Sequence, residues 1–201
     1  MIETKKIIIA SGNRHKFEEI SSIMSEILPD NYQLVFGKTI TDIMPEETGD
    51  TFFDNALIKA KYFCELSEFP AIGDDTGLCV SALDNAPGVY SARFAGENAS
   101  YDDNVNKLLT EIAGIPENDR QAYFICTAIL YLPNGEYFAT EGRIYGSIIH
   151  DKRGFNGFGY DPVFLTECGK TLAELDSDVK NSISHRSAAF RSIAKICLEK
   201  L

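Results

Sequence analysis

Apolar and polar positions along the first thirty residues change from a strand-like to a helix-like pattern. A short apolar run ends at Ser11-Gly-Asn13, which predicts a buried strand over residues 5–10. Over residues 16–28 the apolar side chains recur every three or four positions, as in a helix with one apolar face. Ser11–Lys16 therefore forms a short strand-to-helix connection, where free backbone N–H groups and the helix dipole favour phosphate.

A second helix is predicted over residues 51–66. Thr51 is a candidate N-cap, because a side-chain oxygen there can accept from backbone N–H groups of the first turn. Asn55 and Lys59 lie four residues apart and share a face of this helix that is separate from its apolar stripe. The acidic turn at 45–49 places two glutamates just before the helix.

Helical spacing returns over residues 102–112 and over residues 184–201. Ser184 is a candidate N-cap for the last helix, which places His185 and Arg186 in its first turn. Because cations are disfavoured at a helix N-terminus, two basic residues there indicate a partner anion or a ligand.

The middle of the chain reads as a β-hairpin followed by a shaped loop. Residues 121–132 are rich in strand-forming types and end at Pro133-Asn-Gly135, a strong hairpin turn signal, with the return strand over 137–149. Residues 154–162 contain too many glycines for a regular element.

Two adjacent carboxylates, Asp74 and Asp75, follow the apolar run Phe69–Ile72 in the glycine-bounded stretch 73–96. Because Asp and Gly are depleted in strand interiors, we expect a strand to end here and open onto a loop. Carboxylates at a strand end can hold a hard cation such as Mg2+ or remove a proton from water. An ordinary acidic turn is the alternative.

Composition narrows the class of protein. The 201 residues, 44% hydrophobic and 24% charged, fit one domain that spans residues 1–201. The net charge of −11 argues against a broad nucleic-acid or anionic-membrane surface, and no apolar run approaches the ~18 residues that cross a bilayer. Five scattered cysteines without metal-ligand spacing predict a reduced, cytoplasmic protein.

Candidate residues for a polyphosphate site are spread over the whole chain. Ser11, Asn13 and Lys16 could hold phosphates, while Glu47 and Asp75 could supply oxygens to Mg2+. Lys59, Lys180 and Arg186 add positive charge. Either Phe158 or Tyr160 offers a ring on which a base could stack. Each also has a plain structural explanation: the lysines as solvated helix faces, the ring as core and the glutamates as N-terminal helix charges.

The residues of these segments and their order along the chain resemble those of the inosine triphosphate pyrophosphatase family, which hydrolyses nonstandard purine nucleoside triphosphates. The matching segments span nearly the whole chain: Ser11-Gly-Asn-Arg-His-Lys16 with Glu19, Glu46-Glu-Thr-Gly49 through Asn55-Ala-Leu-Ile-Lys59, Asp74-Asp-Thr-Gly-Leu78, Pro87-Gly-Val-Tyr-Ser-Ala-Arg93, Gly157-Phe-Gly-Tyr-Asp-Pro162 and Lys180-Asn-Ser-Ile-Ser-His-Arg186. Ser11 and Thr76 replace Thr and Ser that are frequent in the family, and both exchanges keep a hydroxyl.

The resemblance implies an α/β fold with an elongated mixed β-sheet flanked by helices, with two lobes and a central cleft, and a homodimer. It implies Mg2+ bound by Glu47 and Asp75, with catalysis by Asp75, Asp74 and Lys16. The substrate-binding residues that it implies are Ser11, Gly12, Asn13, Arg14, His15, Lys16, Lys59, Thr76, Phe158, Gly159, Tyr160, Asp161, Lys180, His185 and Arg186.

The activity implied is hydrolysis of dITP, ITP and XTP to the monophosphate and pyrophosphate, which cleanses the nucleotide pool. A metal ligand is a poorer base than a free carboxylate, so Asp74 competes with Asp75 for the proton of the attacking water. Donors from His185, Arg186 or backbone N–H groups would satisfy the 6-oxo group of the base. A related pyrophosphatase with another base preference and a non-catalytic nucleotide sensor are the alternatives.

Overall fold

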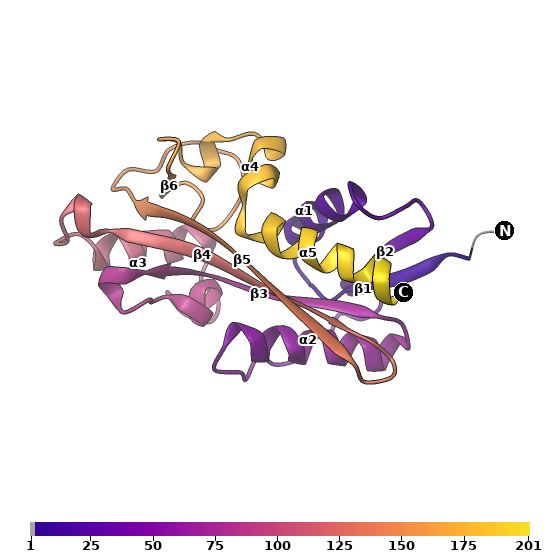
Figure 1. The fold of residues 1–201 in the computed structure, drawn as a ribbon. Coiled ribbons are helices and arrows are strands. Elements are labelled where there is room, and N and C mark those ends of the chain that lie inside the picture. Colours follow the sequence, from indigo (N-terminus) through magenta and orange to yellow (C-terminus); the bar gives the residue numbers. More distant parts are fainter. Residues whose placement is uncertain (1–2) are drawn as a thin grey trace. The chain divides into compact units, whose positions relative to one another are not determined.

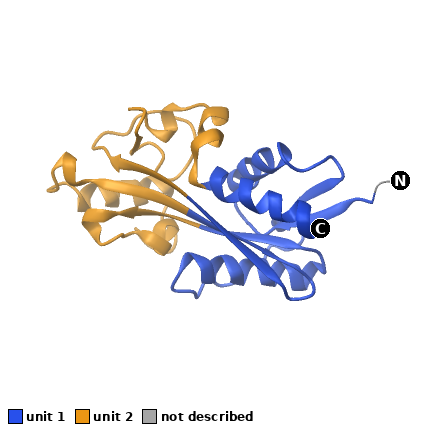
Figure 2. Cartoon of the chain, viewed as in Figure 1, with its two compact units in different colours: residues 1–75, 126–142, 186–201 blue, residues 76–125, 143–185 orange. Residues whose placement is uncertain are grey.

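A computed structural model describes residues 3–201, and these divide into two compact units (Figures 1 and 2). Among the described residues, unit 1 contains residues 3–75, 126–142 and 186–201, and unit 2 contains residues 76–125 and 143–185. The strands are β1 (Lys5–Ile9), β2 (Tyr32–Phe36), β3 (Ala71–Val80), β4 (Gln121–Tyr131), β5 (Tyr137–Ile148) and β6 (Phe164–Thr166). The helices are α1 (Arg14–Ser25), α2 (Phe52–Ser67), α3 (Tyr101–Glu111), α4 (Ser177–Ile183) and α5 (His185–Lys200).

The strands form a mixed sheet in the order β2-β1-β3-β4-β5-β6. β1 pairs in parallel with both β2 and β3, whereas β5 and β6 are antiparallel. The predicted α/β class with a mixed sheet is therefore confirmed. The connection between β4 and β5 is the expected tight turn, in which the Gly135 N–H donates to the Leu132 carbonyl at 2.9 Å.

In unit 1, the alternation of side chains along β1 builds two apolar layers. Ile7 and Ile9 pack with α1 and α5, whereas Ile8 and Ala10 pack with α2. Figure 1 shows α1 and α5 on one side of these strands and α2 on the other. Successive strand residues point to opposite faces, so the continuous apolar run in β1 reflects burial on both sides.

The helices of unit 1 begin at side-chain caps. The Asn13 oxygen accepts from the backbone N–H groups of His15 and Lys16, and the Thr51 hydroxyl accepts from that of Asp54. Gly73 of β3 lets α2 approach closely: a Cβ there would lie 2.6 Å from the Ala60 nitrogen. The backbones of β3 and α2 therefore touch where the acidic residues follow.

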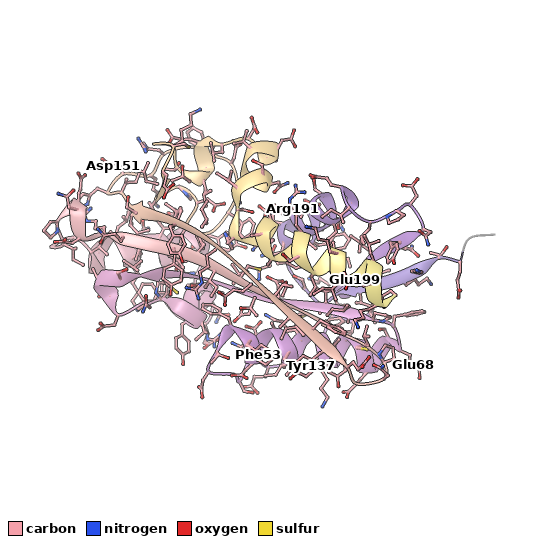
Figure 3. The ribbon with its side chains drawn as sticks, viewed as in Figure 1. Phe53, Glu68, Tyr137, Asp151, Arg191 and Glu199 are labelled. Atoms are coloured by element: carbon pink, nitrogen blue, oxygen red, sulfur yellow. The ribbon has the colours of Figure 1, made fainter. Side chains whose placement is uncertain are left out.

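Side-chain contacts also join α5 to α1 and α2 to β5 in unit 1. Arg191 of α5 pairs with Glu26, immediately after α1, at 2.6 Å. Phe53 of α2 meets Tyr137 of β5 edge to face, with ring centroids 6.1 Å apart. Arg191, Phe53 and Tyr137 are labelled in Figure 3.

Unit 2 has its own apolar core. Leu78 and Val80 of β3 pack with Val105 and Leu108 of α3 and with residues of β4 and of the 160–175 segment. Helix α3 starts at a capping box, in which Ser100 and Asp103 bond each other's backbone N–H groups.

Most elements predicted from the pattern are present, with shifted boundaries. The helix expected over residues 16–28 runs from Arg14 to Ser25, because Asn13 is the cap. The expectation that a strand ends at Asp74 and Asp75 is wrong: β3 continues through both residues to Val80. Charged partners from neighbouring helices neutralise the two carboxylates, so the local preference of Asp for turns does not decide the structure. Strands β2 and β6 and helix α4 were missed.

None of the helices within residues 3–201 is long and apolar enough to cross a membrane.

Candidate functional site

The central feature of unit 1 is that β3 directs its two adjacent carboxylates to opposite faces of the sheet. Ile72 packs in the layer of α1 and α5, and Gly73 contacts α2. With the period of two along a strand, Asp74 belongs to the α1 and α5 face and Asp75 to the α2 face. Both side chains are buried, at 3% and 6% exposure. The two carboxylates therefore contact different helices.

Asp74 forms an ion pair with Lys16 from the first turn of α1, at 3.0 Å between Oδ2 and Nζ. Burial alone would raise the pKa of the Asp74 carboxyl, but nearby cations outweigh it and hold this pKa well below its usual range. The cations, in order of effect, are Lys16, Arg186 and Lys59. Asp74 is therefore a firmly ionised carboxylate.

Arg186 lies on this same face, at the N-terminus of α5. Its guanidinium pairs with Glu19 of α1 at 2.5 Å, and the Arg186 side chain is 2% exposed. A cation in the first turn of a helix is electrostatically disfavoured, and the partly buried Glu19 carboxylate supplies the compensating charge. The predicted partner anion of Arg186 includes a carboxylate of the protein itself.

On the α2 face, the Lys59 ammonium lies between two carboxylates. Its Nζ is 2.8 Å from Glu47 Oε1 and 3.6 Å from Asp75 Oδ1. Burial lowers the pKa of Lys59, but Asp75, Glu47 and Asp74 outweigh burial and raise it above its ordinary value. Lys59 is therefore a fully charged cation held in an acidic cluster.

The pKa of the Asp75 carboxyl is shifted in the opposite direction to that of Asp74. Burial raises it, Lys59 and Lys16 oppose the rise, and Glu47 adds to it, so that the pKa of Asp75 lies above its ordinary value. Of the two neighbours, Asp75 is thus the stronger proton acceptor.

The carboxylate oxygens around Lys59 could supply part of the coordination shell of a divalent cation. Within residues 3–201, no group of three or more His, Cys, Asp and Glu side chains is arranged to hold a metal ion. However, Glu47 and Asp75 already share one cation, the Lys59 ammonium. Mg2+ commonly uses one or two carboxylates and completes its shell with water and substrate phosphates. The chemistry of this donor pair therefore suits Mg2+ that arrives with a phosphorylated ligand.

The connection before α1 uses several of its polar groups locally. The Asn13 side chain caps the helix, and the Ser11 hydroxyl accepts from the Asn13 N–H at 3.1 Å. Arg14 is exposed and pairs with Glu18 at 2.8 Å, while His15 is also exposed. The side chain of Lys16, a predicted phosphate-binding residue of this connection, reaches Asp74 of β3.

In unit 2, a buried ion pair organises the predicted shaped loop. Asp161 Oδ2 accepts from Lys180 Nζ at 2.7 Å and from the Phe158 N–H at 2.9 Å. Gly157 has a φ of +74°, and a Cβ there would collide with the Asp161 carboxylate. The Lys180 ammonium lies 5.0 Å from the centre of the Phe158 ring. Asp161 thus fixes both the backbone and the cation beside this ring.

The other predicted residues of unit 2 differ in accessibility. Tyr160 is 4% exposed and its hydroxyl donates to the Ser91 carbonyl at 2.9 Å, which makes it a core residue. Burial raises the pKa of the Tyr160 phenol. His185, 3% exposed, stacks on Phe124 with centroids 4.8 Å apart. Phe158, Gly159 and Thr76 are partly exposed.

Three residues that contact the predicted site residues were not themselves predicted. Asn55 donates to Asp75, Tyr101 lies 5.8 Å from the Phe158 ring centre, and Phe124 stacks on His185. The shared helical face of Asn55 and Lys59 was a signal for the first of them. No local signal could have found the two rings, because both contacts join segments distant in the chain.

Comparison with known proteins identifies the family of this chain. The model of the Ham1 family matches residues 7–196. A dITP/XTP pyrophosphatase from Thermoanaerobacter sp. is 47% identical over 197 residues, which cover 98% of both chains. Among solved structures, a HAM1 protein from Coxiella burnetii has a TM-score of 0.87 at 35% identity, covering 98% of this chain and 100% of that one.

A Ham1 protein from Staphylococcus aureus has a TM-score of 0.84 at 37% identity, again over 98% of this chain and 100% of the other. These likenesses extend over nearly the full length of each partner, and they include the segments that carry the acidic residues of β3 and the first turns of α1, α2 and α5. The chain belongs to the Ham1 family.

Proposed function

We propose that this protein hydrolyses the nonstandard purine nucleoside triphosphates dITP, ITP and XTP to the monophosphate and pyrophosphate, with Mg2+ as cofactor. Its relatives from Thermoanaerobacter and Treponema denticola bear the name dITP/XTP pyrophosphatase. The product monophosphate cannot be incorporated into DNA or RNA without rephosphorylation, so the activity cleanses the nucleotide pool.

One observation carries the proposal: the buried Lys59 ammonium lies between Glu47 and Asp75, next to a strand that also bears Asp74. A binding module has little use for three carboxylates close to the phosphate-binding lysines, because they repel an anionic ligand. A hydrolase needs both, since it must neutralise a polyphosphate and also orient and deprotonate a water molecule.

Glu47 and Asp75 would hold Mg2+, which when bound supplies charge neutralisation and polarisation of phosphoryl oxygens. Lys59 and Lys16 bind phosphate oxygens of the substrate. Both ammonium groups already lie against carboxylates in unit 1, so substrate oxygens join existing cation–anion networks. Ser11 and the backbone around Gly12 and Asn13 line the same phosphate-binding connection.

Asp75 accepts the proton of the attacking water as the anhydride bond between the α- and β-phosphoryl groups breaks. In the metal-free protein the pKa of Asp75 is raised and that of Asp74 is lowered, which favours Asp75 over Asp74 as the proton acceptor. Asp74 remains ionised and holds Lys16. Pyrophosphate leaves with the electron pair of the broken bond.

Residues of unit 2 recognise the base. The partly exposed Phe158 ring offers a stacking surface, held by the Asp161 carboxylate. Lys180 and His185 are the candidate donors to the 6-oxo group, which distinguishes inosine and xanthosine from adenosine. An amino group in that position would leave a buried donor unpaired, which costs about 1–3 kcal/mol.

All five cysteines are free thiols, which supports a location in a reducing compartment such as the cytoplasm. The homodimer, implied by resemblance alone, stays a prediction, as does the arrangement of residues 1–201 as one catalytic domain.

A panel of nucleotides with Mg2+ tests the proposed activity. We expect pyrophosphate release from ITP, dITP and XTP with kcat/KM about 5–150-fold above that for ATP, because the mispaired donor discriminates by about 1–3 kcal/mol. Similar turnover of ATP and ITP would refute the selectivity. Binding of ITP without pyrophosphate release would identify a sensor, and preference for a modified pyrimidine would identify a related pyrophosphatase.

A further inference from the structure

We propose that Asn55 is a positioning residue that sets the separation of the two metal-binding carboxylates, Glu47 and Asp75. This inference rests on the proposed function, because it concerns the divalent cation assigned there. Asn55 lies in the first turn of α2 and is completely buried, at 0% exposure. A buried amide on a helix needs partners for its donor and its acceptor.

The Asn55 side chain has one partner on each side. Its Nδ2 donates to Asp75 Oδ2 at 3.2 Å, and its Oδ1 accepts from the backbone N–H of Gly49 at 2.8 Å. The first bond orients the Asp75 carboxylate on β3. The second anchors the 46–49 turn, which carries Glu47. One side chain therefore joins the two segments that supply the carboxylates.

The 46–49 turn packs closely on this amide. A Cβ on Gly49 would lie 2.5 Å from Asp54 Cβ and 2.8 Å from Asn55 Oδ1, so glycine is needed for the turn to reach α2. Glu47 lies two residues earlier and contacts Lys59, one helical turn beyond Asn55. Asn55 and Lys59 thus act from the same face of α2, the first through hydrogen bonds and the second through charge.

The hydrogen bond from Asn55 occupies one oxygen of the Asp75 carboxylate and leaves the other directed to the Lys59 ammonium. Asn55 Nδ2 contacts Oδ2, whereas Lys59 Nζ contacts Oδ1. A group that bonds one oxygen of a ligating carboxylate fixes the direction of the other, and loss of such partners commonly lowers metal affinity by about 10–100-fold.

The test compares Asn55→Ala with a matched variant, Asn104→Ala. Asn104 is 2% exposed, occupies the fourth position of α3 as Asn55 does in α2, and also bridges two segments. Its Oδ1 accepts from the Ala95 N–H at 2.7 Å and its Nδ2 donates to the Ala92 carbonyl at 3.1 Å. Each variant loses two buried hydrogen bonds, but only Asn55 contacts a candidate metal ligand.

Calorimetric titration with Mn2+ alone, without nucleotide, gives the first readout, and the Mg2+ concentration for half-maximal pyrophosphate release gives the second. We expect Asn55→Ala to weaken Mn2+ binding by about 10–100-fold and to raise the Mg2+ requirement, with kcat at saturating Mg2+ affected less. Asn104→Ala should keep Mn2+ affinity within about twofold, although both variants unfold more easily.

Wild-type Mn2+ affinity in Asn55→Ala, or an equal loss in Asn104→Ala, would overturn the inference, as would a wild-type protein that binds no Mn2+. If Asn55→Ala does not fold, Asn55→Ser is used; its hydroxyl is too short to hold both partners, and the same loss of Mn2+ affinity is expected. Because binding is measured without substrate, failure to hydrolyse ITP would refute the proposed function alone.

Discussion

Asp75→Asn is expected to lower the turnover of ITP by about 10²–10⁴-fold, the range typical of removing a catalytic proton acceptor. The substitution keeps the size of the side chain and removes its charge and basicity. Lys59 retains its 2.8 Å contact with Glu47, so the α2 face remains folded. The measurement is steady-state pyrophosphate release with saturating Mg2+, together with a thermal unfolding curve.

An exposed carboxylate in unit 1 provides the control. Asp30→Asn removes the same charge from the surface and should leave turnover within about twofold, because isolated surface charges contribute little. Turnover of Asp75→Asn within threefold of the wild type would remove Asp75 from the reaction and leave Asp74 as the candidate base.

Lys59→Met is expected to lower the free energy of unfolding by about 3–5 kcal/mol in the presence of EDTA, because it leaves the buried Asp75 carboxylate and the partly exposed Glu47 carboxylate without their shared counter-ion. The remaining repulsion between Asp75 and Glu47 acts in a cluster that is only partly open to solvent. Mg2+ should recover part of this loss, since a ligand that binds only the folded state stabilises it. Urea denaturation with EDTA and with Mg2+ measures both effects.

Lys61→Met is the matched control for this variant. Lys61 lies on the same helix, and its pair with Glu65 at 3.8 Å is exposed, so its loss should cost less than about 1 kcal/mol and be independent of Mg2+. Equal stability of the Lys59 and Lys61 variants would show that Lys59 is not the counter-ion of the cluster.

Helix α2 shows how far local sequence rules predict this fold. Its Thr51 cap and its apolar stripe placed it within one residue of the observed bounds, because cap chemistry and helical period are local properties. β3 shows where these rules fail. Asp74 and Asp75 favour a turn by local preference, but Lys16 and Lys59 come from distant helices and stabilise both carboxylates within the strand.

The candidate site also has features that the sequence predicted and features that it could not predict. The types and order of residues indicated a polyphosphate site with Mg2+, and the structure brings Lys16, Lys59, Glu47 and both aspartates together in unit 1. The opposite directions of Asp74 and Asp75 could not be predicted while the stretch was interpreted as a loop, because only a strand alternates its side chains. The pairing of Arg186 with Glu19 joins two ends of the chain and leaves no local pattern.

The products formed from ITP test the central claim most directly. Chromatography of a reaction with Mg2+ should show IMP and pyrophosphate in equal amounts, with no IDP, and EDTA should abolish both products. The same reaction with ATP should give little AMP. Formation of IDP and phosphate, or an unchanged rate in EDTA, would contradict a metal-assisted pyrophosphatase built on Glu47 and Asp75.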